Sequence, residues 1–528
     1  IFYQVYPQSF YDSNGDGIGD IPGLIEKLDY IQWLGCNAVW MNPCFDSPFN
    51  DAGYDVRDFY KVAPRYGTNA DLKRLFKEAH KRDMRVLLDL VPAHTSADHP
   101  WFVQSCRPDK NKYTHWYLWT DSAWSWQKEG FSLIRGASDR NGCYLPSFFA
   151  SQPALNLGFA RPDPKQPWQL PVDHPDVKAV RREIKSILRF WLDAGADGFR
   201  ADMASSVVKN DPGWKETSRF WREVRDLLDK HYTEAALLSE WSTPSAAIAA
   251  GFHADFMIHI NDTAYDALFR QEIWRNHWTR RNAPSFFDKQ GKGDITAFLK
   301  PFLNYQAKIR RKGHICVPSG NHDISRLAYG RSSRELELAF AFLMTLPALP
   351  LVYYGDEIGM KYLRHLHSKE GGYERTGSRT PMQWTGGKNA GFSTAPKNKL
   401  YLPVDSAPGA PNVEKQSRKN DSLLNRVRQL IQLRRSAPAL GRDGKLTLLC
   451  AERGKYPLVY LRRAGRQRYL VVLNPSGQDQ TATVILTAKE KPKKLIGRGR
   501  IDFLPHGRRT NLIAGPSGYG IFQISDGD

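Results

Sequence analysis

Apolar residues in this chain gather in short runs that are separated by stretches with the periodicity of an amphipathic helix. Buried strands that alternate with helices of about 10–15 residues are typical of βα units around a parallel sheet. Eight such strands predict a (β/α)8 TIM barrel, an α/β fold. The apolar runs lie at 1–10, 37–40, 85–91, 198–201, 235–239, 254–260, 315–318 and 351–354. Helical periodicity lies between or after them, at 23–34, 71–82, 177–193, 214–231 and 421–435.

This rhythm is interrupted once, and it ends before the C-terminus. Between 96 and 175, Trp, Tyr, Gly, Pro and Ser dominate, and no long helical pattern is present. A stretch of this length inside a compact domain is either functional or a small inserted domain. From about 441 onward the pattern changes to short alternating strands, which predicts an antiparallel β-sandwich. We expect a barrel over 1–95 and 176–438, an inserted domain B over 96–175 after strand three, and a C-terminal β-sandwich over 439–528.

Three of the predicted strands lead into an acidic residue. The fourth and fifth apolar runs deliver Asp202 and Glu240, and the seventh run leads shortly afterwards to Asp323. The carboxyl ends of the strands of an α/β barrel carry its catalytic groups, so we expect these side chains at one face. Each acid alone has an ordinary explanation. A strand-end Asp is more often a helix cap, and Arg200 with Asp202 could form a simple ion pair.

A loop near the start of the chain has oxygen-bearing side chains at alternate positions and a glycine at the sixth position, as a calcium loop requires. The bidentate Glu of a full EF-hand loop is absent, because Gly23 stands there. The loop therefore predicts a variant, structural Ca²⁺ site, although turns rich in Asp and Asn also exist without metal. The candidate ligands are the side chains of Asp12, Asn14, Asp16 and Asp20 and the carbonyl of Ile18.

Composition indicates a folded protein with a basic surface. The 528 residues are 41% hydrophobic and 12% aromatic, enough for a sizeable core, and a charged fraction of 25% argues against disorder. The net charge of +20 could serve a polyanion. The basic residues are spread over the whole chain, however, and the densest run, 489–509, carries no known nucleic-acid motif. We expect a solvated basic face and no nucleic-acid partner, with an acidic partner as the alternative.

Cysteine usage and hydropathy exclude further classes. The six cysteines show no CxxC pair and no regular spacing, so neither a zinc site nor a disulfide framework is indicated. No organic cofactor is expected. No apolar run reaches the roughly 18–20 residues of a membrane span. The chain begins with Ile1 inside a strand pattern, so any signal peptide would lie outside it, and the cellular compartment stays open.

With the three acids placed, the chain resembles the α-amylase family of retaining glycoside hydrolases nearly from end to end. Any one of the motifs that carry the resemblance would be weak alone, whereas their order and separations together are specific. They are Asp89-Leu90-Val91-Pro92-Ala93-His94, Gly198-Phe199-Arg200-Ala201-Asp202, Ser239-Glu240-Trp241 and Asn321-His322-Asp323. The branch of oligo-1,6-glucosidases, α-glucosidases and trehalose synthases is similar in three further stretches: 12–20, Gln152-Pro153-Ala154-Leu155-Asn156 and Arg379-Thr380-Pro381-Met382-Gln383-Trp384.

The resemblance implies a role for each candidate residue. Asp202 would be the nucleophile, Glu240 the general acid/base, and Asp323 the acid that binds sugar hydroxyls and stabilises the transition state. Tyr54 matches the ring on which the glucosyl unit stacks. The remaining matches are Arg200, His94 and His322 in the same subsite, Phe148 and Gln152 from the inserted domain, and Asp51 with Arg379 as the pair that closes the pocket around a non-reducing end.

The chemistry sets the electrostatic expectations. A retaining glycosidase needs two carboxyl groups about 5–5.5 Å apart, one ionised to attack C1 and one protonated to serve the leaving oxygen. We expect Arg200 to hold Asp202 ionised through charge-assisted hydrogen bonds. A less polar setting beside Trp241 is expected to raise the pKa of Glu240.

The expected activity is that of an α-glucosidase acting on short α-glucans or disaccharides, its small carbohydrate substrates, from the non-reducing end. Two alternatives stay open. The glucosyl-enzyme could pass its sugar to an acceptor, as in a trehalose synthase or glucosyltransferase. The enzyme could act internally, as an α-amylase does. A non-catalytic relative is not expected, because it would have lost the acids and carry a membrane anchor, and the sequence shows neither feature. Met203 follows the nucleophile where 1,6-acting relatives tend to have Val, so the linkage is also open.

Overall fold

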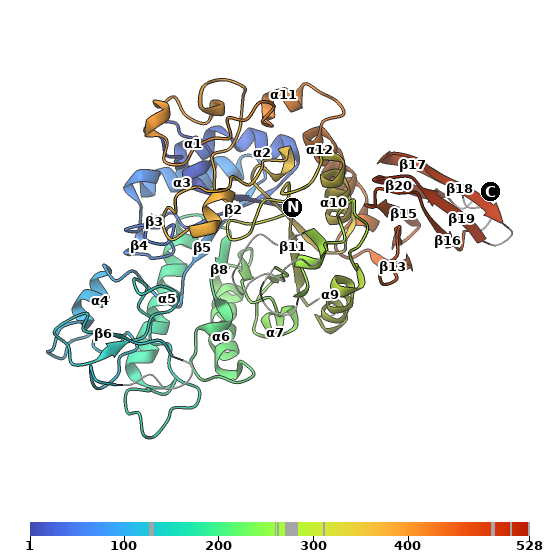
Figure 1. Cartoon of the computed structure of the whole chain (residues 1–528). Coiled ribbons are helices and arrows are strands. Elements are labelled where there is room, and N and C mark those ends of the chain that lie inside the picture. Colours follow the sequence, from blue (N-terminus) through green and yellow to red (C-terminus); the bar gives the residue numbers. More distant parts are fainter. Residues whose placement is uncertain are drawn as a thin grey trace.

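The computed structural model describes residues 1–125, 131–258, 260, 263–269, 284–309, 312–486, 491–506 and 509–525. Within them, eight parallel strands close into a barrel in the order β1-β12-β11-β10-β9-β8-β5-β2 (Figure 1). The predicted (β/α)8 barrel is confirmed, and every predicted apolar run overlaps one of its strands. The strands are β1 (Phe2–Val5), β2 (Ala38–Met41), β5 (Arg85–Leu90), β8 (Gly198–Ala201), β9 (Ala236–Ser239), β10 (Ala254–Phe256), β11 (His314–Pro318) and β12 (Leu349–Tyr353).

Helices connect the strands. Thr68 and Asp71 form a capping box at the start of α3. The helical pattern of 23–34 is two helices, because Lys27 leaves the helical conformation with φ −102° and ψ 4°. Across the described residues no helix has the length and apolar character needed to cross a membrane. The helices are α1 (Ile21–Glu26), α2 (Leu28–Leu34), α3 (Asn69–His80), α5 (Pro175–Asp193), α6 (Lys215–His231), α7 (Pro244–Ala249), α8 (Asp266–Phe269), α9 (Thr296–Ile309), α10 (Ser333–Thr345), α11 (Val413–Ser417) and α12 (Leu423–Ser436).

Two excursions from the barrel reach toward the carboxyl ends of its strands. The first is a hairpin of β3 (Phe45–Asp46) and β4 (Asp58–Val62), which the sequence pattern did not predict. The second lies between β5 and α5 and contains α4 (Pro100–Ser105), β6 (Ile134–Arg135) and β7 (Cys143–Tyr144). It has a small apolar cluster of its own and lies at the lower left of Figure 1. A backbone bridge between His94 and Ala154 joins it to the residues that follow β5.

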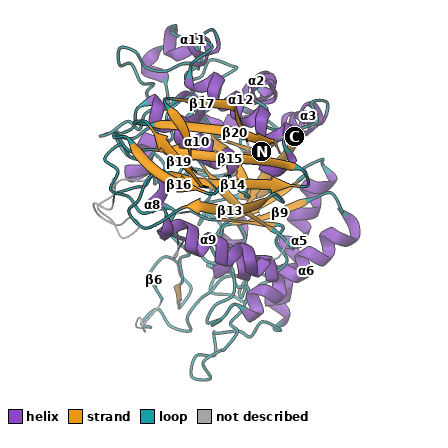
Figure 2. Cartoon of the chain, turned by 90° about the vertical axis from the view of Figure 1, so that its right-hand side faces the viewer, coloured by secondary structure: helices purple, strands orange, loops and turns teal. Residues whose placement is uncertain are grey.

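The C-terminal part consists of two antiparallel sheets, seen face-on in Figure 2. Apolar side chains from both sheets meet between them, among them Val459 and Leu470 from one and Leu512 from the other. The predicted antiparallel β-sandwich is therefore confirmed as a fold. One sheet has the order β13 (Lys445–Cys450), β14 (Leu458–Ala464), β15 (Gln467–Asn474), β20 (Gly518–Ser525), β17 (Lys491–Arg498), and the other β16 (Gln480–Val484), β19 (Arg509–Ala514), β18 (Ile501–His506).

The interior of the barrel is packed with apolar side chains. Trp40, Leu87, Leu238, Phe256 and Leu351 belong to one cluster that comes from different strands. Since successive side chains of a strand point to opposite faces, the neighbours of these residues point outward to the helices. Charged groups that point inward therefore lie above this apolar cluster, at the carboxyl ends of the strands.

Candidate active site

A cavity of about 350 Å³ lies at the carboxyl ends of the barrel strands. Its wall combines strand ends with the β3–β4 hairpin, the inserted segment and the loop after β12. The three predicted acids share this cavity. The candidate residues that line it are Asp51, Tyr54, His94, Phe148, Asp202, Glu240 and Asp323. The other candidates contact these residues from behind and are themselves buried: Gln152, Arg200, His322 and Arg379.

Arg200 contacts three carboxylates at once. Its Nη1 donates to Asp89 at 2.8 Å and to Asp202 at 2.9 Å. Its Nη2 lies 2.9 Å from Oε1 of Glu240. We expected Arg200 to serve Asp202, whereas the structure divides its charge among three acids. One cation cannot neutralise three buried carboxylates, so the cluster favours keeping at least one proton.

Asp202 and Glu240 interact directly. Burial is the main cause that raises the pKa of Asp202 well above its ordinary value, and Arg200 opposes it. The charges of Glu240 and Asp89 and a hydrogen bond with Glu240 raise this pKa further. The second oxygen of Glu240 accepts the amide of Met203 at 3.1 Å. The raised pKa of Asp202 and its hydrogen bond with Glu240 favour a proton within this pair of acids in the free protein, whereas we had expected Arg200 to hold Asp202 ionised.

His322 is held neutral and in one tautomer. Its Nδ1 accepts from Nε2 of Gln4 at 3.0 Å and Nδ2 of Asn42 at 3.1 Å, so the ring proton is on Nε2. That nitrogen lies 3.0 Å from the Tyr54 hydroxyl and 3.1 Å from Oδ2 of Asp323. Burial lowers the pKa of His322 to about 3. The ring also stacks on Tyr54, with centroids 5.4 Å apart and planes inclined by 10°. His322 therefore fixes both the tyrosine ring and the acid.

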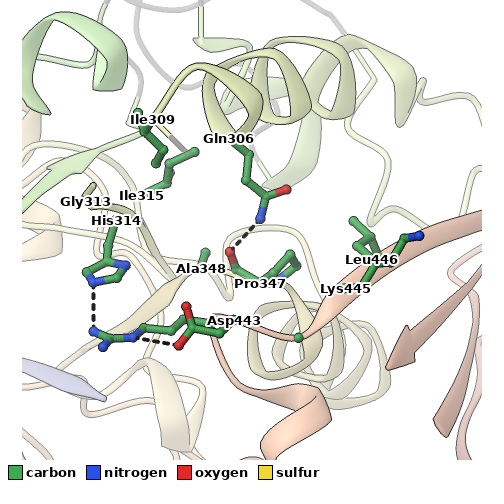
Figure 3. A pocket seen from close by; sticks show the side chains of 12 residues that line it. Gln306, Ile309, Gly313, His314, Ile315, Pro347, Ala348, Asp443, Lys445 and Leu446 are labelled. Carbon is green, nitrogen blue, oxygen red and sulfur yellow. Dashed lines mark hydrogen bonds and ion pairs between the residues drawn. The ribbon is translucent and has the colours of Figure 1, made fainter. Parts of the chain in front are cut away.

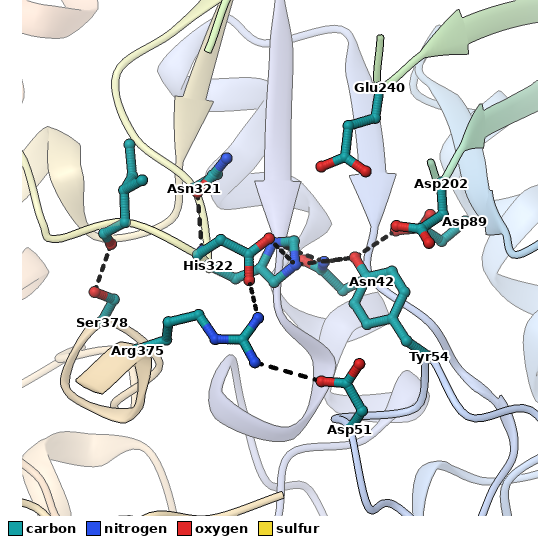
Figure 4. A network of polar contacts seen from close by, with 12 residues as sticks. Asn42, Asp51, Tyr54, Asp89, Asp202, Glu240, Asn321, His322, Arg375 and Ser378 are labelled. Carbon is teal, nitrogen blue, oxygen red and sulfur yellow. Dashed lines mark hydrogen bonds and ion pairs between the residues drawn. The ribbon is translucent and has the colours of Figure 1, made fainter. Parts of the chain in front are cut away.

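Two arginines from the loop after β12 contact Asp323. Its Oδ1 accepts from Nη1 of Arg375 at 2.8 Å and from Nη2 of Arg379 at 3.1 Å. Arg379 also donates to the carbonyl of His322 at 2.9 Å. The other end of the Arg375 guanidinium lies 3.5 Å from Asp51, which Figure 4 shows as part of one polar network. The arginine in direct contact with Asp51 is thus Arg375, while Arg379 acts on that acid from a longer distance.

Asp51 is carried into the cavity by the loop between β3 and β4. Gln152, from the inserted segment, donates to its Oδ2 at 2.8 Å. Burial raises the pKa of Asp51 to about 6, and the charges of Arg375 and Arg379 oppose this rise. The hairpin, the inserted segment and the loop after β12 therefore converge on this one side chain.

His94 and Phe148 complete the cavity wall. Nε2 of His94 donates to the backbone carbonyl of Tyr54 at 3.1 Å, and burial lowers the pKa of His94 to about 3. Its Nδ1 has no hydrogen-bond partner among the described residues, so a neutral acceptor remains for a ligand hydroxyl. Phe148 is 48% exposed and packs edge-on against Phe149 with centroids 4.6 Å apart. It offers an apolar surface at the mouth.

The sequence interpretation gave no role to several residues of this network, although Asp89 opens one of the family motifs. They are Gln4, Asn42, Asp89 and Arg375. The inward position of Asp89 could have been predicted, because side chains alternate along β5 and Asp89 shares the inward face with Leu87. Gln4 and Asn42 are ordinary polar residues in the sequence, and only barrel closure brings them to His322. Arg375 lies in a polar loop and gives no pattern at all.

The comparison with known proteins decides the family. Residues 4–443, which include the barrel and the inserted segment, match the family described as alpha amylase, catalytic domain. The chain belongs to the alpha-amylase family. It is an enzyme of this group of glycoside hydrolases, as the sequence motifs implied.

Relatives within the alpha-amylase family include both synthases and glucosidases. The trehalose synthase/amylase of Mycobacterium tuberculosis (strain CDC 1551 / Oshkosh) is 32% identical over 83% of this chain and 75% of its own length. The glucan 1,6-alpha-glucosidase of Streptococcus pneumoniae serotype 4 is 31% identical over 92% of both chains. The oligo-1,6-glucosidase of Heyndrickxia coagulans is 31% identical over 90% of this chain and 91% of its own.

Solved structures with the same fold include isomaltulose synthases. The enzyme from Klebsiella sp. LX3 superposes with a TM-score of 0.82 at 27% identity, covering 99% of this chain and 98% of its own. The enzyme from Erwinia rhapontici NX5 superposes with a TM-score of 0.79 at 26% identity and the same coverage. The relatives agree on the family and differ in whether their names describe hydrolysis or synthesis.

The loop predicted to bind calcium is closed by its own hydrogen bonds. Asp12 accepts the amides of Gly15 at 2.7 Å and Gly17 at 2.8 Å, and Asp20 caps α1. Within the described ranges no group of three or more His, Cys, Asp and Glu side chains is placed to hold a metal ion. The donors in the loop are nonetheless all oxygens, the ligand type that Ca²⁺ prefers. A structural calcium ion held by this loop stays a prediction.

A second cavity, of about 390 Å³, lies where the N-terminal ends of β11 and β12 meet the start of the C-terminal sheets (Figure 3). Its wall includes His314, whose Nε2 lies 2.8 Å from Nη1 of Arg442. None of the candidate residues lines it. Since active sites of α/β barrels lie at the carboxyl ends of the strands, this cavity is not the catalytic one.

Proposed function

We propose that this protein is a retaining α-glucosidase-type enzyme that removes glucosyl units from short α-glucans or disaccharides. The observation that carries the proposal is the placement of Asp202 and Glu240, which contact the same guanidinium of Arg200 and line the same cavity. Two carboxyl groups around one anomeric carbon are what a retaining mechanism requires.

The first step forms a covalent β-glucosyl-enzyme. Asp202 attacks C1 while the bond from C1 to the glycosidic oxygen breaks, and Glu240 gives its proton to that oxygen, so the leaving sugar departs neutral. A substrate that enters between the two carboxyl groups replaces the hydrogen bond between them. The proton then stays on Glu240, and Arg200 remains to stabilise the ionised Asp202.

The second step releases the sugar. Glu240, now ionised, takes a proton from the incoming hydroxyl, whose oxygen attacks C1 and breaks the bond to Asp202. The amide of Met203, 3.1 Å from Oε2 of Glu240, supports this carboxylate form through a hydrogen bond. Two inversions at C1 leave the product with the α configuration.

Asp323, His322 and His94 are proposed to bind the hydroxyls of the reacting glucosyl unit. Their hydrogen bonds are favourable because all three side chains are buried or half-buried and already oriented by neighbours. Asp51 and Asp323 are joined through Arg375, and this ion-paired wall favours a blind pocket that accepts a chain end. Early glucose release from maltoheptaose supports this exo mode, and early fragments of middle length without glucose reject it.

A second candidate function is isomerisation, or transfer of the glucosyl unit to another sugar. It shares the glucosyl-enzyme and differs only in what captures it. The relatives named trehalose synthase and the structural similarity to isomaltulose synthases favour keeping this candidate. An endo-acting α-amylase is the third alternative, and the maltoheptaose experiment addresses it.

The test is a panel of maltose, isomaltose, trehalose, sucrose and maltooligosaccharides, with products resolved over time by NMR. The hydrolase proposal expects α-glucose as the first new anomer, rising in proportion to substrate loss. Conversion of one disaccharide into another with little free glucose would instead establish isomerisation. β-Glucose as the first anomer would exclude a retaining mechanism altogether.

A further inference from the structure

We propose that Asp255 is a positioning residue for Glu240, and that its buried carboxylate holds the Ser239 side chain before Glu240 and the backbone after it, from the outer face of the barrel. The proposal rests on the proposed role of Glu240 as the general acid/base. Asp255 lies in β10, beside β9, and it is fully buried. The pairing of Asp255 with Ser239 puts it next to the residue that precedes Glu240.

One oxygen of Asp255 accepts three hydrogen bonds. Its Oδ1 lies 2.6 Å from the hydroxyl of Ser239, 3.1 Å from the amide of Trp241 and 3.3 Å from the amide of Ser242. These donors come from the residue before Glu240 and from the two residues after it. A single carboxylate therefore fixes the short segment whose centre carries the proposed proton donor.

Asp255 acts from the side of the strand that faces away from the cavity. Leu238 and Phe256 belong to the apolar cluster inside the barrel. Because side chains alternate along a strand, Ser239 and Asp255 point outward and Glu240 points inward. Asp255 is not among the residues that line the cavity. It can influence the reaction only through the backbone of Glu240.

The backbone after Glu240 is shaped to bind an anion. Ser242 has a left-handed conformation with φ 55°, which turns successive amides toward one side. Burial raises the pKa of Asp255 to about 7, and its hydrogen bonds with Ser239 and the amides of 241–243 oppose the rise. Removing the carboxylate would leave buried amides without an acceptor, so the turn would relax.

Relaxation of this turn would disturb the reacting groups. The carboxyl end of Glu240 is held by Arg200 at 2.9 Å and by the amide of Met203 at 3.1 Å. If the backbone end of the side chain shifts, the distance from the carboxyl group to the glycosidic oxygen changes while Asp202 stays in place. A misplacement of about 1 Å costs on the order of 100-fold in rate.

The experiment compares two substrates in the variant Asp255→Leu, which keeps the branched shape of the side chain and removes the oxygen that accepts from Ser239, Trp241 and Ser242. The disaccharide that the product panel identifies needs a proton on its leaving oxygen, whereas a dinitrophenyl α-glucoside does not. We expect kcat/KM to fall about 100-fold for the disaccharide and less than about threefold for the aryl glucoside. In Ser239→Ala, kcat/KM should fall about tenfold for the disaccharide and less than about threefold for the aryl glucoside. An equal loss of kcat/KM on both substrates would overturn the proposal. The ratio of the two kcat/KM values does not depend on what fraction of the protein is folded.

Two further variants separate the possible failures. Glu357→Met is the matched control, because it also removes a buried acceptor carboxylate, which accepts from Tyr3 at 2.8 Å and Tyr30 at 2.7 Å and does not line the cavity. The ratio of its kcat/KM values for the two substrates should equal that of the wild type. Glu240→Gln should lose activity on the disaccharide and keep activity on the aryl glucoside. An equal loss on both substrates in Glu240→Gln would overturn the proposed function itself. A selective loss in Glu240→Gln without a selective loss in Asp255→Leu would overturn only the positioning role.

Discussion

Nη1 of Arg375 lies 2.8 Å from Oδ1 of Asp323, which joins the loop after β12 to the acid proposed to bind the sugar. The same guanidinium lies 3.5 Å from Asp51. In the free enzyme Arg375 therefore links two acids that come from opposite parts of the barrel sequence. A sugar that enters the cavity has to share these acids with Arg375 or displace it.

The variant Arg375→Gln should lower kcat/KM for the disaccharide by about 10–30-fold, since hydrogen bonds to charged groups contribute about 1.5–3 kcal/mol and this residue is partly exposed. The loss should lie mainly in KM, because the sugar then meets two acids without their common cation. Steady-state kinetics checks this result. Arg418→Gln is the control, since Arg418 forms an exposed ion pair with Glu414. An unchanged KM in Arg375→Gln would show that the bridge plays no part in sugar binding.

Asp202→Asn should reduce kcat/KM for disaccharides by about 10⁴-fold or more, because no carboxylate remains to form the covalent bond. The melting temperature should stay equal or rise, since burial raises the pKa of Asp202 and its charge is costly beside Glu240 and Asp89. Kinetics and thermal unfolding measure both quantities. Asp109→Asn, at an exposed position, serves as the control. Substantial residual turnover would assign the nucleophile to another residue.

Ionisation of Asp51 should destabilise the fold. Its folded pKa is raised to about 6, above the unfolded value, so its stabilising contribution is present below about pH 4 and is lost as the pH rises through 6. Arg375, Arg379 and Asp323 are the charged groups that face it. Relative to Asp51→Asn, the wild type should lose about 3 kcal/mol at most between pH 4 and pH 7. Unfolding midpoints of both proteins across this range provide the measurement. A difference that stays constant with pH would contradict the raised pKa.

Removal of calcium should lower stability without changing the chemistry. If the loop of Asp12 and Asp20 holds the ion, a chelator should lower the melting temperature by about 2 °C or more, and added Ca²⁺ should restore it. Mg²⁺ should not restore it, because this smaller ion demands stricter geometry. Asp12→Asn should have a lower melting temperature than the wild type, and the chelator and added Ca²⁺ should change that temperature less. A chelator that leaves the wild type unchanged would show that the hydrogen bonds of Asp12 close the loop alone.

The parts of the fold that local patterns dictate could be predicted from the sequence. The strands of the barrel are apolar runs because helices cover their outer faces, so each run could be placed, together with the acids that follow three of them. The hairpin of β3 and β4 was missed, because β3 has only two residues, β4 is only partly buried, and neither strand carries such a run.

Relationships between distant segments could not be predicted in this way. Arg375 reaches Asp51 only because a loop after the last strand folds back over the barrel mouth. Asp255 lies in a strand recognised by its apolar content, and its partner Ser239 is set by the pairing register of β9 and β10. The sequence also did not indicate that Arg200 contacts three acids instead of one, since its contact with Asp89 depends on the neighbouring strand β5.

The central claim is that Asp202 forms a covalent bond with the sugar, and trapping this intermediate tests it most directly. A fluorinated glucosyl fluoride reacts rapidly in the first step and slowly in the second, so the glucosyl-enzyme should accumulate. Peptide mass mapping should then find one glycosyl adduct on the peptide that contains Asp202, and none in Asp202→Asn. An adduct on Asp323 or elsewhere, or full turnover of disaccharide by an enzyme that never carries an adduct, would contradict the account.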